Sequence, residues 1–211
     1  MELTKLKINF IGDSITEGIG VAEIENSYVH RITEATGCVC RNYGVSGTRI
    51  ARQSKASANT KHDLDFNARV PCMDPDADLI VVFGGTNDFG RGDAPLGGPE
   101  DKGVYSFYGA VQSLYYSLKV HFPGKPIVVV TPLHRFRPED ELLRPCLVEY
   151  VRIIQEIAIR NELPVLNLYD NSKIHPRTEN VREQYVPDGL HPNDDGHAIL
   201  AEEILEFLKN L

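Results

Sequence analysis

The sequence has no long apolar run. None approaches the roughly 20 residues that a helix needs to cross a bilayer. The N-terminal apolar run is too short for the core of a signal peptide, and we interpret it as a strand. These absences predict a cytoplasmic protein that does not insert into a membrane.

An excess of positive charge is also lacking. The chain has 22 Lys and Arg against 30 Asp and Glu, a formal net charge of −8 and a sequence pI of about 5.4. Because nucleic-acid binding relies on a basic face, this balance argues against a nucleic-acid partner. Small anions are not excluded, since one local arginine can hold them.

Cysteines are few. In a reducing compartment the four are expected to be free thiols: Cys38, Cys40, Cys72 and Cys146. Cys38 and Cys40 alternate in "CVCRNY", which one face of a strand explains. No second cysteine pair or spaced histidines accompany them, so we expect no metal there.

Internal repeats and flexible linkers are missing as well. The chain has 211 residues, 42% hydrophobic and 25% charged, enough to form one sizeable core. No stretch is rich enough in Pro, Gly or Ser to separate two domains. We therefore predict a single domain over residues 1–211.

The sequence does contain alternating strand-like and helix-like segments. Five short apolar runs predict strands at 8–11, 38–43, 79–83, 127–130 and 165–168. Apolar residues at helical spacing predict helices at about 27–36, 107–118, 147–158 and 200–211, the first ending at Gly37. This alternation predicts an α/β fold with an open parallel sheet and helices on both faces.

Two long connections, 48–78 and 88–104, interrupt this pattern. Long ordered loops often carry function. Five arginines in loops at the carboxyl ends of the strands either hold an anionic substrate or are simply solvated: Arg49, Arg52, Arg91, Arg135 and Arg137.

Short polar motifs follow the predicted strands. They are "GDS" (12–14), "GVSG" (44–47), "GGTND" (84–88) and, before the last helix, "PDGLHP" (187–192). Ligands of open α/β sheets bind beyond the carboxyl ends of the strands, so all four motifs are expected on one rim.

These motifs supply the parts of a hydrolytic site. Ser14 offers a hydroxyl, His191 a base, and Asp188 a carboxylate that can orient the imidazole. The N–H groups of Ser14 and Gly47 and the side-chain amide of Asn87 can form an oxyanion hole. Together they predict a serine nucleophile on the rim.

Each part also has a simpler explanation. Ser14 alone is a good helix N-cap, and Gly47 alone suits a turn that needs positive φ. Asn87 is common in turns, and Asp188 with His191 can be a surface pair before a helix. Since the parts converge on one rim, we favour the hydrolytic site.

At these motifs the chain resembles the SGNH hydrolase superfamily of GDSL-like lipases, esterases and acylhydrolases. The blocks "GDS", "NYGVSG", "GGTND" and "DGLHP" match the family's four blocks in order. The resemblance implies a flavodoxin-like three-layer α/β/α sandwich with strand order 2-1-3-4-5. It implies Ser14 as nucleophile, His191 as base with Asp188 as its partner, and Ser14, Gly47 and Asn87 as oxyanion donors.

The turn that carries the serine has other possible uses. A phosphate cradle is not expected, because neither G-x-G-x-x-G nor a P-loop lysine is present, and the G-x-S-x-G elbow is absent too. Gly12 and Asp13 let the strand turn sharply, which would leave Ser14 exposed above the sheet edge. Asp13 and His134 are candidate substrate contacts.

The remaining histidines suggest no second site. His197 is expected to be structural, and Asp194 and Asp195 to complement the dipole of the last helix, so this cluster predicts no metal. Four histidines form no recognisable constellation: His30, His62, His121 and His175.

These residues predict a serine ester hydrolase that needs no cofactor and acts on a small-molecule ester. The loops at the rim are polar, which favours a short acyl group, such as acetyl on a carbohydrate, over a long-chain lipid. A thioesterase or lysophospholipase is the alternative among enzymes, and a catalytically dead sugar- or ester-binding module is the alternative of another class. A homo-oligomer is compatible with the sequence.

Overall fold

The computed structural model describes residues 2–211 and contains a five-stranded parallel sheet of order β2-β1-β3-β4-β5. The strands are β1 (Lys7–Gly12), β2 (Val39–Gly44), β3 (Leu79–Phe83), β4 (Ile127–Val130) and β5 (Val165–Leu166). The predicted runs and strand order are confirmed. β5 is shorter than predicted because the side chain of Asn167 accepts the N–H of Asp170 and begins a helix at Leu168.

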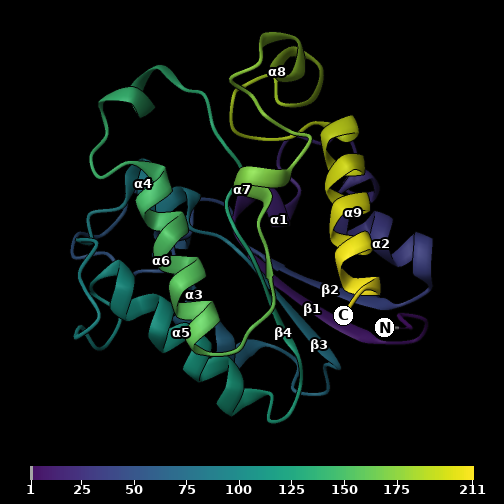
Figure 1. Ribbon diagram of the computed structural model, residues 1–211, viewed down its shortest axis with the longest axis horizontal. Coiled ribbons are helices and arrows are strands. Elements are labelled where there is room, and N and C mark those ends of the chain that lie inside the picture. The colour runs from purple at the N-terminus through teal and green to yellow at the C-terminus, as the bar shows by residue number, and fades with distance from the viewer. Residues whose placement is uncertain (1) are drawn as a thin grey trace.

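Long helices cover both faces of the sheet (Figure 1). One face carries α2 (Tyr28–Thr36) and α9 (Asp194–Lys209), and the other carries α5 (Phe107–His121) and α6 (Leu147–Arg160). Along β3, Val81 packs with the α2/α9 side while Ile80 and Val82 pack with the α5/α6 side. This alternation makes two apolar cores and confirms the three-layer α/β/α sandwich.

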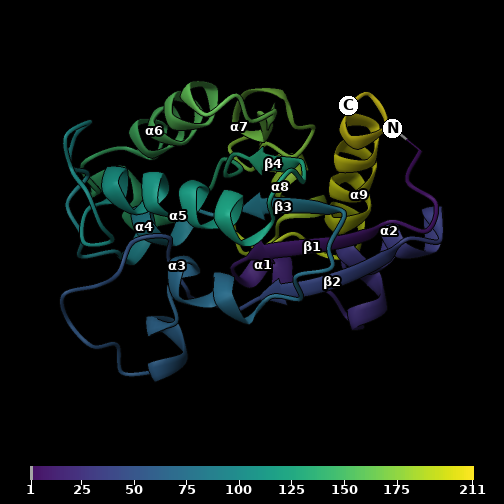
Figure 2. The ribbon, with the colours of Figure 1, turned by 90° about the horizontal axis from the view of Figure 1, so that it is seen from below.

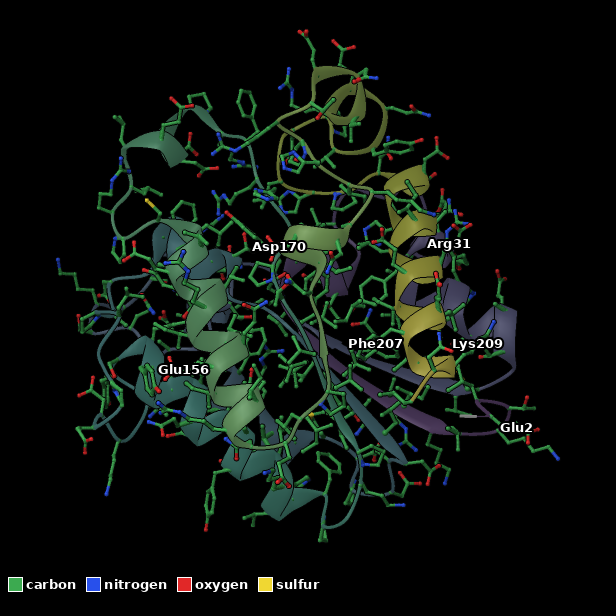
Figure 3. All side chains as sticks on the ribbon, in the orientation of Figure 1. Glu2, Arg31, Glu156, Asp170, Phe207 and Lys209 are labelled. Atoms are coloured by element: carbon green, nitrogen blue, oxygen red, sulfur yellow. The ribbon has the colours of Figure 1, made fainter. Side chains whose placement is uncertain are left out.

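Two helix ends follow from local sequence. α2 ends at Gly37, as predicted, where φ is 70°. The side chain of Asn193 accepts the N–H of Gly196 and starts α9, which places two acidic residues in its first turn. Arg31 of α2 reaches across to α9 and donates to the Asp194 carbonyl at 3.4 Å (Figure 3).

Short helices fill the connections. They are α1 (Ser14–Glu17), α3 (Phe66–Arg69), α4 (Thr86–Arg91), α7 (Leu168–Asn171) and α8 (Glu179–Tyr185), with 3-10 turns η1 (Ile24–Asn26), η2 (Thr60–Asp63), η3 (Val70–Cys72) and η4 (Pro138–Leu142). The strands point toward one end of the molecule, where α1, α4 and the segment containing η2 lie (Figure 2). This end is the rim on which the polar motifs converge.

Residues 2–211 contain no helix that is long and apolar enough to cross a membrane. The same residues contain no group of three or more His, Cys, Asp or Glu side chains arranged to hold a metal ion. The four cysteines are free thiols, with the Sγ atoms of Cys38 and Cys40 3.3 Å apart.

Candidate active site

The turn after β1 is built from three small residues. Gly12 has no room for a side chain, because a Cβ there would lie 1.9 Å from the Thr16 hydroxyl oxygen. The Asp13 carboxylate accepts the N–H of Ile15 at 3.1 Å and caps α1, whose first residue is Ser14. The strand therefore turns within two residues, as predicted.

Ser14 itself differs from the prediction. It is only 2% exposed, so the expectation of a serine standing free above the sheet edge is wrong. The imidazole of His191 covers it, with Nε2 3.0 Å from the Ser14 Oγ. These two residues are 177 positions apart in the chain, and the loop before α9 brings them together.

The same loop holds Asp188 against His191. His191 Nδ1–H donates to Asp188 Oδ2 at 2.7 Å, while the backbone N–H groups of His191 and Leu190 donate to Oδ1 at 2.6 and 2.9 Å. Since an ionised carboxylate only accepts hydrogen bonds, Nδ1 carries the proton and Nε2 is free to accept the Ser14 proton. This chain of bonds can move a proton from a hydroxyl to an imidazole.

A glycine makes the loop possible. Gly189 has φ of 76°, and a Cβ there would lie 2.0 Å from the carbonyl oxygen of Phe136. The N–H of Phe136 donates to the Gly189 carbonyl at 2.8 Å. The loop that carries His191 is thus fastened to the segment after β4.

Asp188 stays ionised within this network. Burial opposes its ionisation, but hydrogen bonds from the side chain and N–H of His191 and from the N–H of Leu190 hold the pKa of Asp188 well below its usual range. Arg137 Nη2 also donates to Asp188 Oδ2, at 2.8 Å. The sequence placed Arg137 on the rim but gave no sign of this contact.

Two of the predicted oxyanion donors, Gly47 and Asn87, lie in the segments that follow β2 and β3. The N–H of Val45 donates to the Gly12 carbonyl at 3.2 Å and brings the "GVSG" loop beside the serine turn. Asn87 is buried, and its Nδ2 donates to the Thr48 carbonyl at 3.0 Å. Gly47 and Asn87 therefore lie at neighbouring points of the rim, although one amide hydrogen of Asn87 is already used.

Gly47 also has a neighbour that sequence reasoning missed. Its φ is 76°, and a Cβ there would lie 2.5 Å from Nε2 of His62. The imidazole of His62 thus lies against the "GVSG" loop, a contact that the sequence did not predict. No motif marks His62, because it reaches this position through the irregular segment that contains η2.

A buried arginine fixes the carboxyl ends of β1 and β2. Arg69 Nη2 donates to the Gly12 carbonyl and the Thr48 hydroxyl, both at 3.0 Å, and Nη1 donates to the Tyr43 carbonyl. Burial lowers the pKa of Arg69 to about 10, with the charge of Asp13 opposing the shift. Sequence reasoning missed this role, since nothing local distinguishes Arg69 from a surface arginine.

Asp13 and His134, the two candidate substrate contacts, both have identifiable partners within the protein. Asp13 is almost fully buried and accepts the Ile15 N–H, which gives it a capping role; burial raises its pKa to about 6. The His134 ring stacks on Tyr169 at 3.8 Å and tilts toward His175 at 4.1 Å. Burial, with the charge of His175, lowers the pKa of His134 to about 4. His134 lines a cavity of about 260 Å³.

His197 is structural, as predicted. It is fully buried in α9, its Nδ1 accepts the N–H of Tyr28 at 3.1 Å, and its ring stacks on the Tyr28 ring at 5.9 Å. Burial lowers its pKa to about 4, which keeps the acceptor nitrogen unprotonated at neutral pH.

Comparison with known proteins identifies relatives over almost the whole chain. The GDSL-like lipase/acylhydrolase family matches residues 10–199. An acetylxylan esterase from Geobacillus stearothermophilus is 26% identical, over 94% of this chain and 92% of its own. An isoamyl acetate-hydrolyzing esterase from Schizosaccharomyces pombe is 25% identical, over 94% and 73%. The crystal structure of a protein from Lactobacillus plantarum superposes with a TM-score of 0.84 at 27% identity, covering 98% of both chains.

Proposed function

Since this chain belongs to the GDSL-like lipase/acylhydrolase family and is a carboxylic ester hydrolase, we propose that it acts through Ser14, His191 and Asp188 on short-chain acyl esters. One observation carries the proposal. The Ser14 Oγ lies 3.0 Å from His191 Nε2, whose other ring nitrogen is bound by an ionised Asp188.

The first half of the reaction forms an acyl-enzyme. His191 takes the proton of the Ser14 hydroxyl as its oxygen attacks the ester carbonyl carbon. The negative charge that develops on the carbonyl oxygen is accepted by the N–H groups of Ser14 and Gly47 and by the free amide hydrogen of Asn87. The imidazolium then gives its proton to the departing alkoxide, which leaves as the alcohol.

The second half regenerates the serine. His191 takes a proton from water, the hydroxide attacks the acyl carbon, and the collapse of the second tetrahedral intermediate returns the proton to Ser14 as the acid is released. Asp188 keeps its negative charge throughout and stabilises the imidazolium. Every proton in this cycle is transferred by a side chain already in the network.

A short acyl group is the preferred substrate. The names of two relatives specify acetyl esters, acetylxylan and isoamyl acetate, and the chain covers most of each relative. The rim loops add polar and charged residues rather than a long apolar surface. We therefore propose acetyl as the acyl group, with a carbohydrate as one class of alcohol.

Turnover of p-nitrophenyl esters tests the proposal. Wild-type protein should hydrolyse p-nitrophenyl acetate, and kcat/KM should fall along a series through butyrate and octanoate to palmitate. Ser14→Ala should lower kcat by a factor on the order of 10⁶ while its thermal unfolding stays cooperative. A rising series would indicate a lipase or lysophospholipase, and binding without turnover would indicate a dead binding module.

A further inference from the structure

Three of the five rim arginines have carboxylate partners. The pairs are Arg52 with Asp65 at 2.8 Å, Arg135 with Asp140 at 2.9 Å, and Arg137 with Asp188 at 2.8 Å. Within residues 2–211, no carboxylate lies within ion-pairing distance of Arg49 or Arg91. The structure thus separates the arginines with a partner from two without one.

Arg49 is the more unusual of the two because it is only 6% exposed. Its Nη1 donates to the Ser57 hydroxyl and its Nη2 to the Arg91 carbonyl, both at 3.3 Å. Its Nε is buried and has no hydrogen-bond partner in the described part of the chain. Burying a guanidinium with an unpartnered Nε is costly, so this arrangement needs a reason.

Three nearby aspartates act on Arg49 through their charge, but none of them contacts its guanidinium. Their carboxylates accept backbone N–H groups instead: Asp63 from Ser57, Asp88 from Ile50 and Ala51, and Asp93 from Ser54 and Lys55. Burial raises the pKa of Asp88 to about 7, which weakens its negative charge at neutral pH. Arg49 therefore has negative charge nearby, but no carboxylate forms a direct ion pair with it.

Arg91 presents a free guanidinium beside Arg49. It is exposed, ends α4, and forms no side-chain hydrogen bond or ion pair with residues 2–211. Asn87 precedes it by four residues, so the two side chains lie on one face of the helix. Desolvation of its covered part, followed by the charges of Arg49 and Arg135, lowers the pKa of Arg91.

This positive charge adjoins the predicted oxyanion hole. Asn87 is bound to the Thr48 carbonyl, one residue before Arg49 and one after Gly47. His62 lies against Gly47, and burial, followed by the charges of Arg91 and Arg49, lowers its pKa. We call Arg49 and Arg91 the basic cluster, beside which the neutral form of His62 is favoured.

We propose that the ester cleaved at Ser14 carries an anionic group, a carboxylate, sulfate or phosphate, which binds to the basic cluster. The inference rests on the proposed esterase function and adds the charge of the substrate to it. The guanidinium fork of Arg91 matches such groups bidentately, and Arg49 supplies fixed positive charge behind it. In a chain of net charge −8, a local positive field beside the reacting serine selects anions.

Matched substrate pairs test this charge preference. 4-Acetoxybenzoate places a carboxylate on the alcohol part, and its methyl ester is the neutral equivalent. Mono-(4-nitrophenyl) succinate places the carboxylate on the acyl part, and its methyl ester is again neutral. For at least one pair, wild-type kcat/KM should be about tenfold or more higher for the anionic ester, and the ratio should fall with added salt.

Substitutions of Arg91 then test whether this side chain causes the preference for the anionic ester. Arg91→Gln should reduce the ratio of kcat/KM for the anionic ester to kcat/KM for the neutral ester about tenfold, and Arg91→Glu should invert it. A loss of rate that is common to both esters cancels in this ratio. Arg49→Lys should lower the ratio less, because the charge remains while the fork is lost. Arg160→Gln is the matched control, since Arg160 ends α6 and pairs with Glu156, labelled in Figure 3, at 2.6 Å. Its ratio should equal the wild-type ratio.

Two outcomes separate this inference from the esterase proposal. Hydrolysis of both esters at a ratio near one, or a ratio unmoved by Arg91→Gln and Arg91→Glu, overturns the basic cluster as a binding site and leaves the esterase proposal standing. If neither ester is hydrolysed, calorimetry with 4-acetamidobenzoate and its methyl ester reads out binding alone. A preference for the anion that disappears in Arg91→Gln supports the cluster, and equal binding refutes it.

Discussion

The two sides of Ser14 differ in whether their charged side chains form ion pairs. Toward the α2/α9 face of the sheet, His191, Asp188 and Arg137 form a continuous network in which each charged group has a partner. Toward the α5/α6 face, Arg49 and Arg91 have no carboxylate partner within the described residues. A site that only moved protons would need the first side alone, so the second side points to a ligand.

The contrast extends to how each side is held. The side with His191, Asp188 and Arg137 is the acidic side. There, short hydrogen bonds from backbone N–H groups of the same loop hold the Asp188 carboxylate in place. The basic side is assembled from separate segments that meet at the Thr48 and Arg91 carbonyls. The first arrangement suits a base that keeps one geometry, and the second suits a surface that receives a charged group of the substrate.

The largest expected effect lies on the acidic side. Asp188→Asn should lower kcat for p-nitrophenyl acetate by up to about 10⁴, because an amide can leave the imidazole in the wrong tautomer. Asp195→Asn, an exposed acid in the first turn of α9, is the control and should keep wild-type kcat. An Asp188→Asn variant within a factor of three of wild type would remove Asp188 from the proposed mechanism.

The next effect concerns the donor that joins the two sides. Asn87→Ala should lower kcat roughly 10²–10³-fold with little change in KM, since the charge that the amide stabilises exists mainly in the transition state. It should also lower the free energy of unfolding by about 1–3 kcal/mol, because the buried Thr48 carbonyl loses its donor. Reduced stability with kcat preserved would mean that Asn87 only shapes the turn.

A smaller effect is expected in the pH profile. His191 must be neutral to accept a proton, so kcat/KM should fall when acidification protonates the imidazole. The positive charge of Arg137 disfavours a second positive charge on the neighbouring imidazole. Arg137→Gln should therefore move the acidic limb of the profile to higher pH. A downward shift would contradict this role of Arg137.

The smallest expected effect concerns the free energy of unfolding and its dependence on Asp13, the residue before Ser14. Burial raises the pKa of Asp13 from 3.8 to about 6, so the folded state binds more protons than the unfolded state between these values, and stability falls as pH rises through them. Asp13→Asn removes this penalty while keeping a capping oxygen. The unfolding free energy of Asp13→Asn minus that of the wild type, measured by urea titration, should increase by about 1 kcal/mol between pH 5 and pH 7.5. A constant difference would place the pKa of Asp13 near its ordinary value.

Much of this arrangement could be predicted from sequence because it follows from topology. Apolar runs such as "LIVVF" and "IVVV" coincide with β3 and β4, and the motifs after the strands must share one rim. That rule and the family resemblance together predicted a meeting of Ser14 and His191, and the structure brings these residues within hydrogen-bonding distance.

What could not be predicted depends on loops that fold against distant segments. Arg137 reaches Asp188 across 51 residues, and His62 reaches Gly47 through an irregular segment, so neither contact has a local pattern. The burial of Ser14 depends on the loop that covers it. The lack of an ion pair at Arg49 and Arg91 can be recognised only when the position of every carboxylate is known, and no sequence motif supplies those positions.

Covalent labelling by a fluorophosphonate tests the central claim most directly, namely that His191 activates Ser14 as the nucleophile. Intact-mass analysis and peptide mapping should find one adduct per chain, on Ser14. Labelling should disappear in Ser14→Ala and keep its wild-type rate in Ser46→Ala, a second serine of the rim motifs. It should slow by orders of magnitude in His191→Ala. An adduct on another residue, or unchanged labelling of the Ser14→Ala or His191→Ala variant, would contradict the account.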